Sequence, residues 1–235
     1  MTDVLGEVIA DFTPPPHPKG INLQGEHILI EPLDDAKHGA HLFAAKQRDR
    51  SGDNWTYLPY GPFADELSYR QWLISQQDSD DPCFFAMIDR VTQQAVGIAS
   101  YLRIDQANGV IEVGHIHFSP LLQRRTASTE ALFLMMQWAF DAGYRRYEWK
   151  CNALNIPSRR AAQRLGLSFE GIFRQMMISK GRNRDTAWFA AIDKEWPALR
   201  QAYRTFFSAD NFTSDGTAIQ SLSSLTAPLL HQRDG

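Results

Sequence analysis

The sequence predicts an α/β (α+β) fold, a central mixed and mostly antiparallel sheet of about six to seven strands with helices on both faces. Three consecutive segments rich in apolar, β-branched and aromatic residues are separated by polar turns, which is typical of an antiparallel meander. Helical and strand-like patterns then alternate, which places helices on the faces of the sheet. The chain of 235 residues is long enough to bury a core around such a sheet.

Composition excludes several classes of protein. Hydrophobic residues make up 43% and charged residues 22% of the chain, as in soluble globular proteins. A net charge of −3 argues against a general nucleic-acid binder, whose surface would be basic. No signal peptide and no run of 18 apolar residues is visible, so we expect a cytoplasmic protein that does not span a membrane. Cys83 and Cys151 lie in strand-like runs and are expected to be buried and reduced.

The N-terminal half predicts an arm, one strand, two helices and the meander. Prolines favour an extended arm over residues 1–24, because proline cannot donate to a β-ladder. Asp34 or Asp35 is placed to cap the first helix. Residues 52–63 form a loop rich in aromatic side chains. The predicted elements are a strand at 27–33, helices at 36–47 and 68–77, and strands at 83–89, 95–104 and 109–119.

From residue 127 the apolar period changes to a helical one. The segment 127–142 is apolar nearly all round, which predicts a helix buried on two sides, and Gly143 is placed to end it. Residues 208–235 contain eight Ser or Thr and little periodicity, so we expect a flexible or loosely docked tail. The remaining elements of the domain, which spans 25–207, are a strand at 145–151, a helix at 155–166, two strands around a turn at 180–185, and a helix at 196–207.

The segment that follows the meander carries two motifs. A strand-like stretch leads into QRRTASTEA at 123–131, and Asn155-x-x-Ser158 is followed by RLG. In order and spacing these motifs resemble the GNAT family of acetyl-CoA-dependent N-acetyltransferases, whose cofactor motif is Q/R-x-x-G-x-G/A. The TEA and N-x-x-S motifs resemble the branch of ribosomal-protein N-terminal (Rim-type) acetyltransferases, except that Leu167 replaces a phenylalanine. The resemblance covers about 25–207 and implies the GNAT fold.

The turn at 123–128 has a physical interpretation of its own. A strand that runs into a helix leaves backbone N–H groups without intrahelical acceptors, and with the positive end of the helix they form a site for a pyrophosphate. Arg124 and Arg125 add positive charge. Thr126 and Ser128 occupy the two glycine positions of the motif, so a plain basic helix start is the alternative. The resemblance implies that acetyl-CoA is bound by Phe118, Ser119, Gln123, Arg124, Arg125, Thr126, Ala127, Ser128, Thr129, Asn155 and Ser158.

Acetyl transfer to an amine requires a group that accepts the amine proton and a group that protonates the departing thiolate. Glu112 lies where the family often carries its base. Its alternative is an exposed strand carboxylate, and the choice depends on whether Gly114 marks a bulge. The resemblance assigns the acid to Ser158, and a helix-capping hydroxyl is the alternative. A backbone N–H near Phe118 or Ser119 is expected to polarise the thioester carbonyl.

Six residues are candidates for binding the acceptor amine. His115 and His117 are two residues apart, so an unbroken strand would put both on one face. We expect no metal there, because further ligands are missing at suitable spacing. The aromatic loop supplies three candidates, and each of the six has a structural role as its alternative. The other four are Trp55, Tyr57, Tyr60 and Asp185.

The resemblance implies an N-acetyltransferase that moves an acetyl group from acetyl-CoA to a primary amine by direct attack. The acceptor is a protein N-terminus or a small molecule, and the sequence does not decide between them. A non-catalytic acyl-CoA-binding regulatory protein and a transferase that uses another acyl donor are the alternatives. We expect no metal, nucleic-acid or membrane partner, and the chain is either a monomer or a homodimer.

Overall fold

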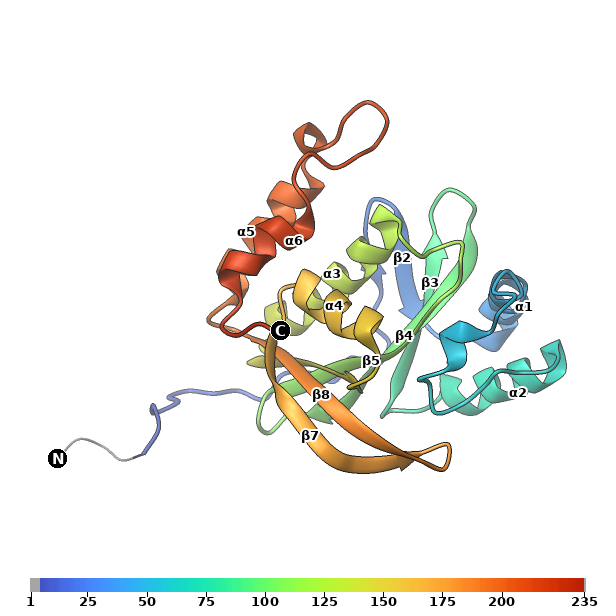
Figure 1. Cartoon of the computed structure of the whole chain (residues 1–235), viewed down its shortest axis with the longest axis horizontal. Coiled ribbons are helices and arrows are strands. Elements are labelled where there is room, and N and C mark those ends of the chain that lie inside the picture. The colour runs from blue at the N-terminus through green and yellow to red at the C-terminus, as the bar shows by residue number, and fades with distance from the viewer. Residues whose placement is uncertain (1–4, 235) are drawn as a thin grey trace.

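The computed structural model describes residues 5–234, and at its centre lies one eight-stranded sheet (Figure 1). The strand order is β1-β2-β3-β4-β5-β6-β8-β7, and only the neighbours β5 and β6 run parallel. The strands are β1 (Leu23–Gln24), β2 (Ile28–Pro32), β3 (Cys83–Asp89), β4 (Gln94–Asp105), β5 (Val110–Phe118), β6 (Arg146–Asn152), β7 (Ser168–Ser179) and β8 (Arg182–Ile192). The helices are α1 (Asp35–Lys46), α2 (Glu66–Gln77), α3 (Thr126–Asp141), α4 (Ile156–Arg164), α5 (Trp196–Phe207) and α6 (Leu222–Thr226).

The predicted fold class, with a mixed and mostly antiparallel sheet, is confirmed. The sheet has one strand more than the predicted upper limit, because the two residues of β1 pair with β2. A strand of two residues is too short to give an alternating pattern in the sequence. Local capping also follows the sequence: Asp34 accepts the Lys37 amide at the start of α1, and Asn155 accepts the Ser158 amide at the start of α4.

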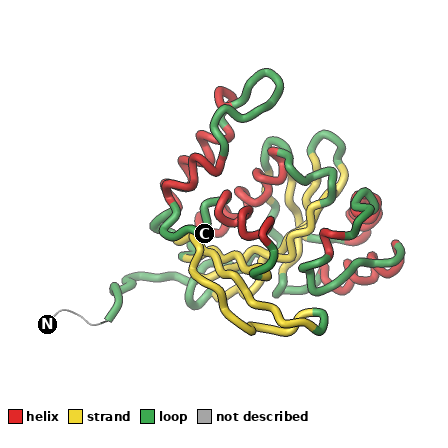
Figure 2. Tube along the Cα trace, in the orientation of Figure 1, coloured by secondary structure: helices red, strands yellow, loops and turns green. Residues whose placement is uncertain are grey.

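Helices cover both faces of the sheet, as predicted (Figure 2). α1 and α2 pack on β3 and β4 around a cluster that includes Leu42, Tyr69 and Phe84. α3, α4 and α5 pack on the other face in a larger core that includes Met135 and Phe189. α1 and α2 do not extend over β6 and β8. We call the part of their face formed by β5, β6 and β8 the open face.

Both ends of the chain pack on the domain in part. The described portion of the predicted arm has no regular structure before β1, and the carbonyls of Pro15 and Pro16 accept bonds from Gln106 and Tyr144. Residues 1–4 of the predicted arm and Gly235 of the predicted tail lie outside the described residues.

The described part of the C-terminal tail differs from a flexible segment. α6 packs on α4 and α5, with Leu222 and Thr226 buried. The His231 amide bonds to Ser168 at 2.8 Å, and Asp234 forms an ion pair with Arg159. α6 has only five residues, which is too short to give an apolar period in the sequence, and the contacts of His231 and Asp234 are polar.

Glu130 fixes α3 to the start of the sheet. Its carboxylate is buried and accepts the backbone N–H groups of Glu26 (2.7 Å), His27 (2.7 Å) and Ile28 (3.1 Å). A Cβ on Gly25 would lie 2.4 Å from the Glu130 carboxyl carbon. Only glycine therefore leaves room for this carboxylate, which holds the helix whose first turn forms the candidate site.

Gly25→Ala is expected to displace the Glu130 carboxylate and lower the free energy of unfolding by about 1–3 kcal/mol. Urea unfolding measures the change. Gly6→Ala is the matched control, because a Cβ at Gly6 meets nothing within 4 Å. In a Glu130→Ala background the Gly25→Ala change should cost little, and an undiminished cost there would contradict the steric cause.

Candidate functional site

Strands β5 and β6 part near the centre of the sheet. They pair over residues 110–113 and 146–149. β5 continues to Phe118 and β6 to Asn152, and within residues 5–234 these continuations do not pair with each other. β5 stays paired with β4 on its other edge. Beyond Val113 the main chain of β5 therefore presents a strand edge to a gap, where an extended ligand can bond to it.

A β-bulge in β5 decides which side chains share a face. Between Gly114 and His117, β5 has two residues where β4 has one, and His115 takes a left-handed φ of 51°. In an unbroken strand Glu112 and His115 would point to opposite faces. The extra residue brings Glu112, His115 and His117 onto the face of α1 and α2, where they contact Lys150, Tyr60 and Trp55 respectively.

The turn after β5 leaves a set of backbone donors free. α3 begins at Thr126, and Arg125 is its N-cap residue. The Gln123 and Ser128 amides bond to the carbonyls of Ser119 and Arg125, but among the described residues no acceptor meets the amides of residues 124–127. These four donors lie at the positive end of a 16-residue helix. The arrangement is suited to an anion such as a diphosphate.

The two motif glycines are not needed in this backbone. Thr126 and Ser128 both lie inside α3, where every residue has ordinary helical angles. The left-handed residue of the turn is Arg124, with a φ of 59°. The Ser128 hydroxyl donates to a carbonyl of the turn at 2.6 Å, and the Thr129 hydroxyl accepts a bond from α4 at 3.1 Å. Both hydroxyls are therefore engaged within the protein.

Phe118 and Ser119 end β5 at the mouth of the gap. The Phe118 carbonyl accepts bonds from the side chains of Gln123 (2.8 Å) and Asn54 (3.3 Å), which tie the turn to the aromatic loop. The Ser119 amide donates to the Val96 carbonyl at 3.1 Å. Of the donors expected near Phe118 or Ser119, the Ser119 N–H is therefore already bonded to β4 in this structure, and polarisation of the carbonyl by a backbone N–H in this region stays a prediction.

Asn155 and Ser158 begin α4 on the side of the sheet that faces α3. Asn155 is the N-cap residue, and its Oδ1 accepts the Ser158 amide at 3.2 Å. The Ser158 hydroxyl instead accepts a bond from the Trp149 indole at 3.0 Å. Ser158 therefore does not cap the helix through its hydroxyl, and its proton is left to be donated elsewhere.

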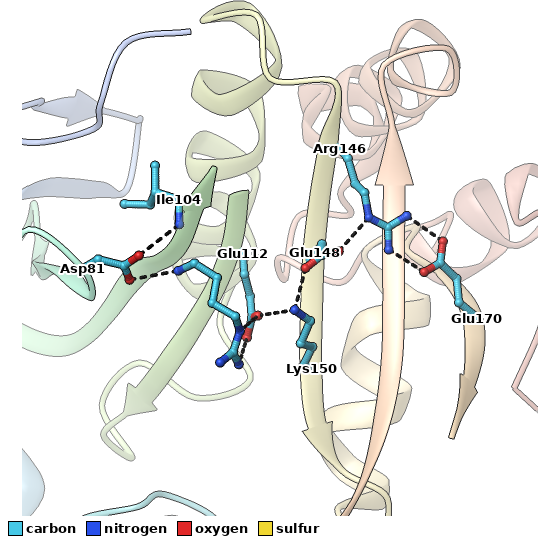
Figure 3. A network of polar contacts seen from close by, with 8 residues as sticks. Asp81, Ile104, Glu112, Arg146, Glu148, Lys150 and Glu170 are labelled. Carbon is cyan, nitrogen blue, oxygen red and sulfur yellow. Dashed lines mark hydrogen bonds and ion pairs between the residues drawn. The ribbon is translucent and has the colours of Figure 1, made fainter. Parts of the chain in front are cut away.

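Six charged side chains form an ion-pair network across the open face (Figure 3). Successive nitrogen–oxygen distances along it are 2.7, 3.0, 2.7, 2.7 and 2.5 Å. Its middle members are almost fully buried, with 3% of the Glu112 side chain and 6% of the Lys150 side chain exposed. In order the network runs Arg103, Glu112, Lys150, Glu148, Arg146 and Glu170.

Cationic side chains surround the carboxylate of Glu112. Two N–H groups of Arg103 and the ammonium of Lys150 donate to its carboxylate. Lys150 also lies 3.6 Å from the centroid of the Trp188 ring, a cation–π contact. Burial alone would raise the pKa of the neighbouring Glu148, but hydrogen bonds from Lys150 and Arg146 outweigh it and hold that pKa below its usual value.

His117 is buried, His115 is partly buried, and both rings are neutral near pH 7. His117 stacks on Trp55 with ring centroids 4.0 Å apart, and the His115 Nδ1 lies 3.1 Å from the Tyr60 hydroxyl. Burial lowers the pKa of each histidine to about 4, so both carry no charge near pH 7. The His117 Nε2 is buried and has no partner in the part of the chain that the structure describes.

The aromatic loop at 52–63 is fastened over the end of the open face. Trp55 is only 2% exposed and packs among Tyr60, Phe63 and Tyr69, so it is a core residue here and does not line an open cleft. The hydroxyl of Tyr57 donates to the Leu154 carbonyl at 3.2 Å. Lys180, at the tip of the β7–β8 hairpin, donates to the Trp55 carbonyl at 2.8 Å.

Asp185 lies apart from the other candidates. Its carboxylate accepts the Gln175 amide at 2.7 Å and the Asn183 side chain at 2.9 Å, which stabilises a bulge in β7. It lines a surface hollow of about 820 Å³ that does not include Glu112 or His115. These contacts give Asp185 a structural role in the β7–β8 hairpin, which is the alternative to binding the acceptor amine.

The structure adds three residues that the motifs did not indicate, Arg103, Lys150 and Arg184. Arg146, Glu148 and Lys150 alternate along one strand, and this alternation is the sequence signal for a charged sheet face. Their partners on β4 and β5 are chosen by strand register, which the sequence does not display.

The two cysteines are free and buried, as predicted. Burial raises the pKa of both thiols, that of Cys83 to about 11, so neither is a thiolate nucleophile near pH 7. Within residues 5–234, no three His, Cys, Asp or Glu side chains gather closely enough to hold a metal ion. The helices of that same range include none with the length and apolar character needed to cross a membrane.

Comparison with known proteins identifies relatives of this chain. Residues 27–168 match the family model described as an acetyltransferase (GNAT) domain. A crystal structure of a GCN5-related N-acetyltransferase from Brucella melitensis is 48% identical, with a TM-score of 0.90 over 93% of this chain and 100% of that one. A probable GNAT-family acetyltransferase from Chromobacterium violaceum is 40% identical, with a TM-score of 0.77 over 83% and 97%. The uncharacterized N-acetyltransferase YnaD of Bacillus subtilis is 23% identical over 60% of this chain and 81% of its own length.

The histidine pair predicts a pH dependence of stability. As pH falls from 6.5 to about 4, the unfolded chain binds protons on both histidines that the folded chain does not, so the free energy of unfolding falls. Each histidine contributes a slope of about 1.4 kcal/mol per pH unit. His117→Phe keeps a ring on Trp55 and removes one of these protons, so its slope should be shallower by about that amount.

Urea unfolding between pH 4.5 and 7.5 measures these slopes. His41→Phe is the control, because the His41 side chain is exposed on α1 and should leave the slope unchanged. A wild-type stability that stays flat between pH 6.5 and 5 would show that the two rings are not held neutral.

Proposed function

Because the chain belongs to the GNAT family of acetyltransferases, we propose that it moves an acetyl group from acetyl-CoA to a primary amine by direct attack. The family uses acetyl-CoA, which would supply the acetyl group as a thioester. The observation that carries the proposal is the set of four backbone amides at 124–127, for which residues 5–234 supply no acceptor, just after the strand that borders the gap.

The residues around the gap fit this co-substrate. The amides of 124–127 and the side chain of Arg124 would hold the diphosphate. The unpaired edge of β5 beyond Val113 would bond the extended pantetheine arm, together with the Asn155 side chain. Thr126 and Ser128, which stand where the family motif has glycines, already have helical backbone angles. The amides can therefore bind the diphosphate without a change of backbone at these two positions.

Glu112 and Ser158 would act from opposite faces of the sheet. Glu112 would accept the proton of the amine, directly or through water, because it places a carboxylate at the level where the strands part. The Ser158 hydroxyl, oriented by the Trp149 indole, would donate its proton toward the departing sulfur. Direct attack requires no cysteine, in keeping with the two buried thiols. Much of the rate would come from holding the two reactants together in the gap.

Thr126→Pro tests the backbone donors. Proline fits the first position of a helix, and Arg125 already has the extended backbone that a following proline requires, so the change removes one N–H and keeps α3. Loss of one hydrogen bond to a charged phosphate should weaken CoA binding by about 10- to 100-fold. Isothermal titration calorimetry with CoA measures the affinity.

Thr126→Ala is the matched control, because it removes the hydroxyl and keeps the N–H. It should bind CoA within about threefold of the wild type, since a neutral side-chain contact contributes little. If Thr126→Pro binds CoA as tightly as Thr126→Ala does, the amide at residue 126 takes no part in binding, and the proposal loses its main support.

Glu112→Gln should lower kcat by about 10²- to 10⁴-fold while the affinity for CoA stays within about twofold. The amide has the shape of the carboxylate but accepts a proton far less readily. Thiol release from acetyl-CoA, across peptide α-amines and small amines between pH 6 and 9, measures the turnover. Glu170→Gln makes the same chemical change at the exposed end of the network and should keep full activity.

The same assay separates the alternatives. Full kcat in Glu112→Gln across this pH range would show that Glu112 is not the base. The neutral His115 would then be the candidate for that role. Tight CoA binding with no thiol release from any amine would favour a non-catalytic binding protein. Release from a longer acyl-CoA alone would identify a different acyl donor.

A further inference from the structure

Arg184 is a cation without a partner on the open face. It is partly buried on β8, and among the described residues no carboxylate lies within 4 Å of it. Its Nε is buried with no hydrogen-bond partner. One Nη reaches only the sulfur of Met177 at 2.9 Å, and a thioether is a weak acceptor. Partial burial of a charge without a counter-ion is unfavourable, so this arginine needs an explanation.

The neighbouring charges do not compensate it. The ion-pair network contains three cations and three anions and is neutral by itself. Burial lowers the pKa of Arg184 and the charge of Arg103 lowers it further, while Glu112 acts in the opposite direction. Asp81 near Arg103 is exposed, and its carboxylate accepts the backbone amides of residues 103 and 104. Arg184 is thus a cation without an ion-pair partner among the described residues, and it lies within electrostatic reach of Glu112.

Two more polar groups without partners follow Arg184 along the same face of β8. The Thr186 hydroxyl and the Trp188 indole N–H are buried, and neither has a partner within residues 5–234. Positions 184, 186 and 188 point to one side of the strand, which is the side of Lys150 on the neighbouring strand. The guanidinium Nε–H, the hydroxyl and the indole N–H can each donate a hydrogen bond, and none of the three has an acceptor among the described residues.

We propose that the acceptor amine also carries a carboxylate, which binds to the guanidinium of Arg184 while the amine faces Glu112. This inference rests on the proposed transferase function and names its substrate class. A guanidinium binds a carboxylate through two parallel hydrogen bonds. An acceptor that brought only an ammonium would leave the guanidinium of Arg184 without a counter-ion, whereas an amino acid or another amino carboxylate brings a carboxylate to pair with it.

Matched pairs of amines test the proposal. Thiol release from acetyl-CoA is compared for glycine, β-alanine, 4-aminobutyrate, 5-aminopentanoate and L-phenylalanine, and for methylamine, ethylamine, propylamine, butylamine and phenethylamine. At least one acid should exceed its partner amine in kcat/KM by ten-fold or more. Equal kcat/KM within every pair would overturn the inference and leave the transferase function standing. A ten-fold preference for 3-aminopropylphosphonate over 4-aminobutyrate would overturn the carboxylate in favour of a phosphate.

Variants of Arg184 connect that preference to this side chain. Arg184→Met should lower kcat/KM for the preferred acid by 10- to 100-fold and change that of its partner amine less than threefold. Arg184→Lys should recover part of the loss, since it restores a charge without the planar fork. Arg182→Met, an exposed arginine two residues away on the same strand, is the control and should leave both substrates unchanged. An equal loss for acid and amine in Arg184→Met would show a structural role only.

A binding measurement keeps this inference separate from the proposed function. Calorimetry of 4-aminobutyrate and L-phenylalanine with CoA-saturated protein needs no turnover. Binding that Arg184→Met weakens ten-fold would support the carboxylate site even if no amine releases thiol. Absence of binding together with absence of turnover would overturn both. Urea unfolding of Arg184→Met should show equal or higher stability, because the variant removes a cation without a partner.

Discussion

The parting of β5 from β6 is the constraint on which the rest of the structure depends. The strands are parallel, so a helical crossover must join them, and α3 provides it. The crossover places the N-terminus of α3, whose first amides have no acceptor among the described residues, just after the unpaired end of β5. A phosphate-binding turn and an open strand edge therefore arise from one topological feature, with Glu130 holding the helix in place.

The gap connects two chemically different faces. On the α3 side, Trp149 and Ser158 form a neutral hydrogen-bonded pair over an apolar core. On the other side, Glu112 and Lys150 belong to a largely buried ion-pair network. Such networks add little to stability once desolvation is counted, but they fix side-chain positions closely. That division suits a reaction in which one side takes up a proton and the other side supplies one.

Segments that are distant in the sequence cover one end of the open face. The aromatic loop covers one end and is fastened by the Tyr57–Leu154 and Lys180–Trp55 bonds. The β7–β8 hairpin that carries Lys180 also carries Arg184, so the element that covers the face also supplies the cation that has no ion-pair partner among the described residues. Acceptor selection would then depend on the hairpin and the loop, while the gap and the turn serve the donor.

The sequence by itself determined the fold class, the course of most elements and the strand-to-helix turn at 123–128, because these follow from periodicity and turn chemistry within a few residues. The tertiary structure alone decided that Glu112 shares a face with His115 and His117, since one bulge residue between Gly114 and His117 reverses the alternation of β5. It also decided that the Ser119 amide donates to the Val96 carbonyl and that Arg103 and Lys150 flank Glu112. These outcomes depend on strand register and on partners far away along the chain, and no local pattern records them.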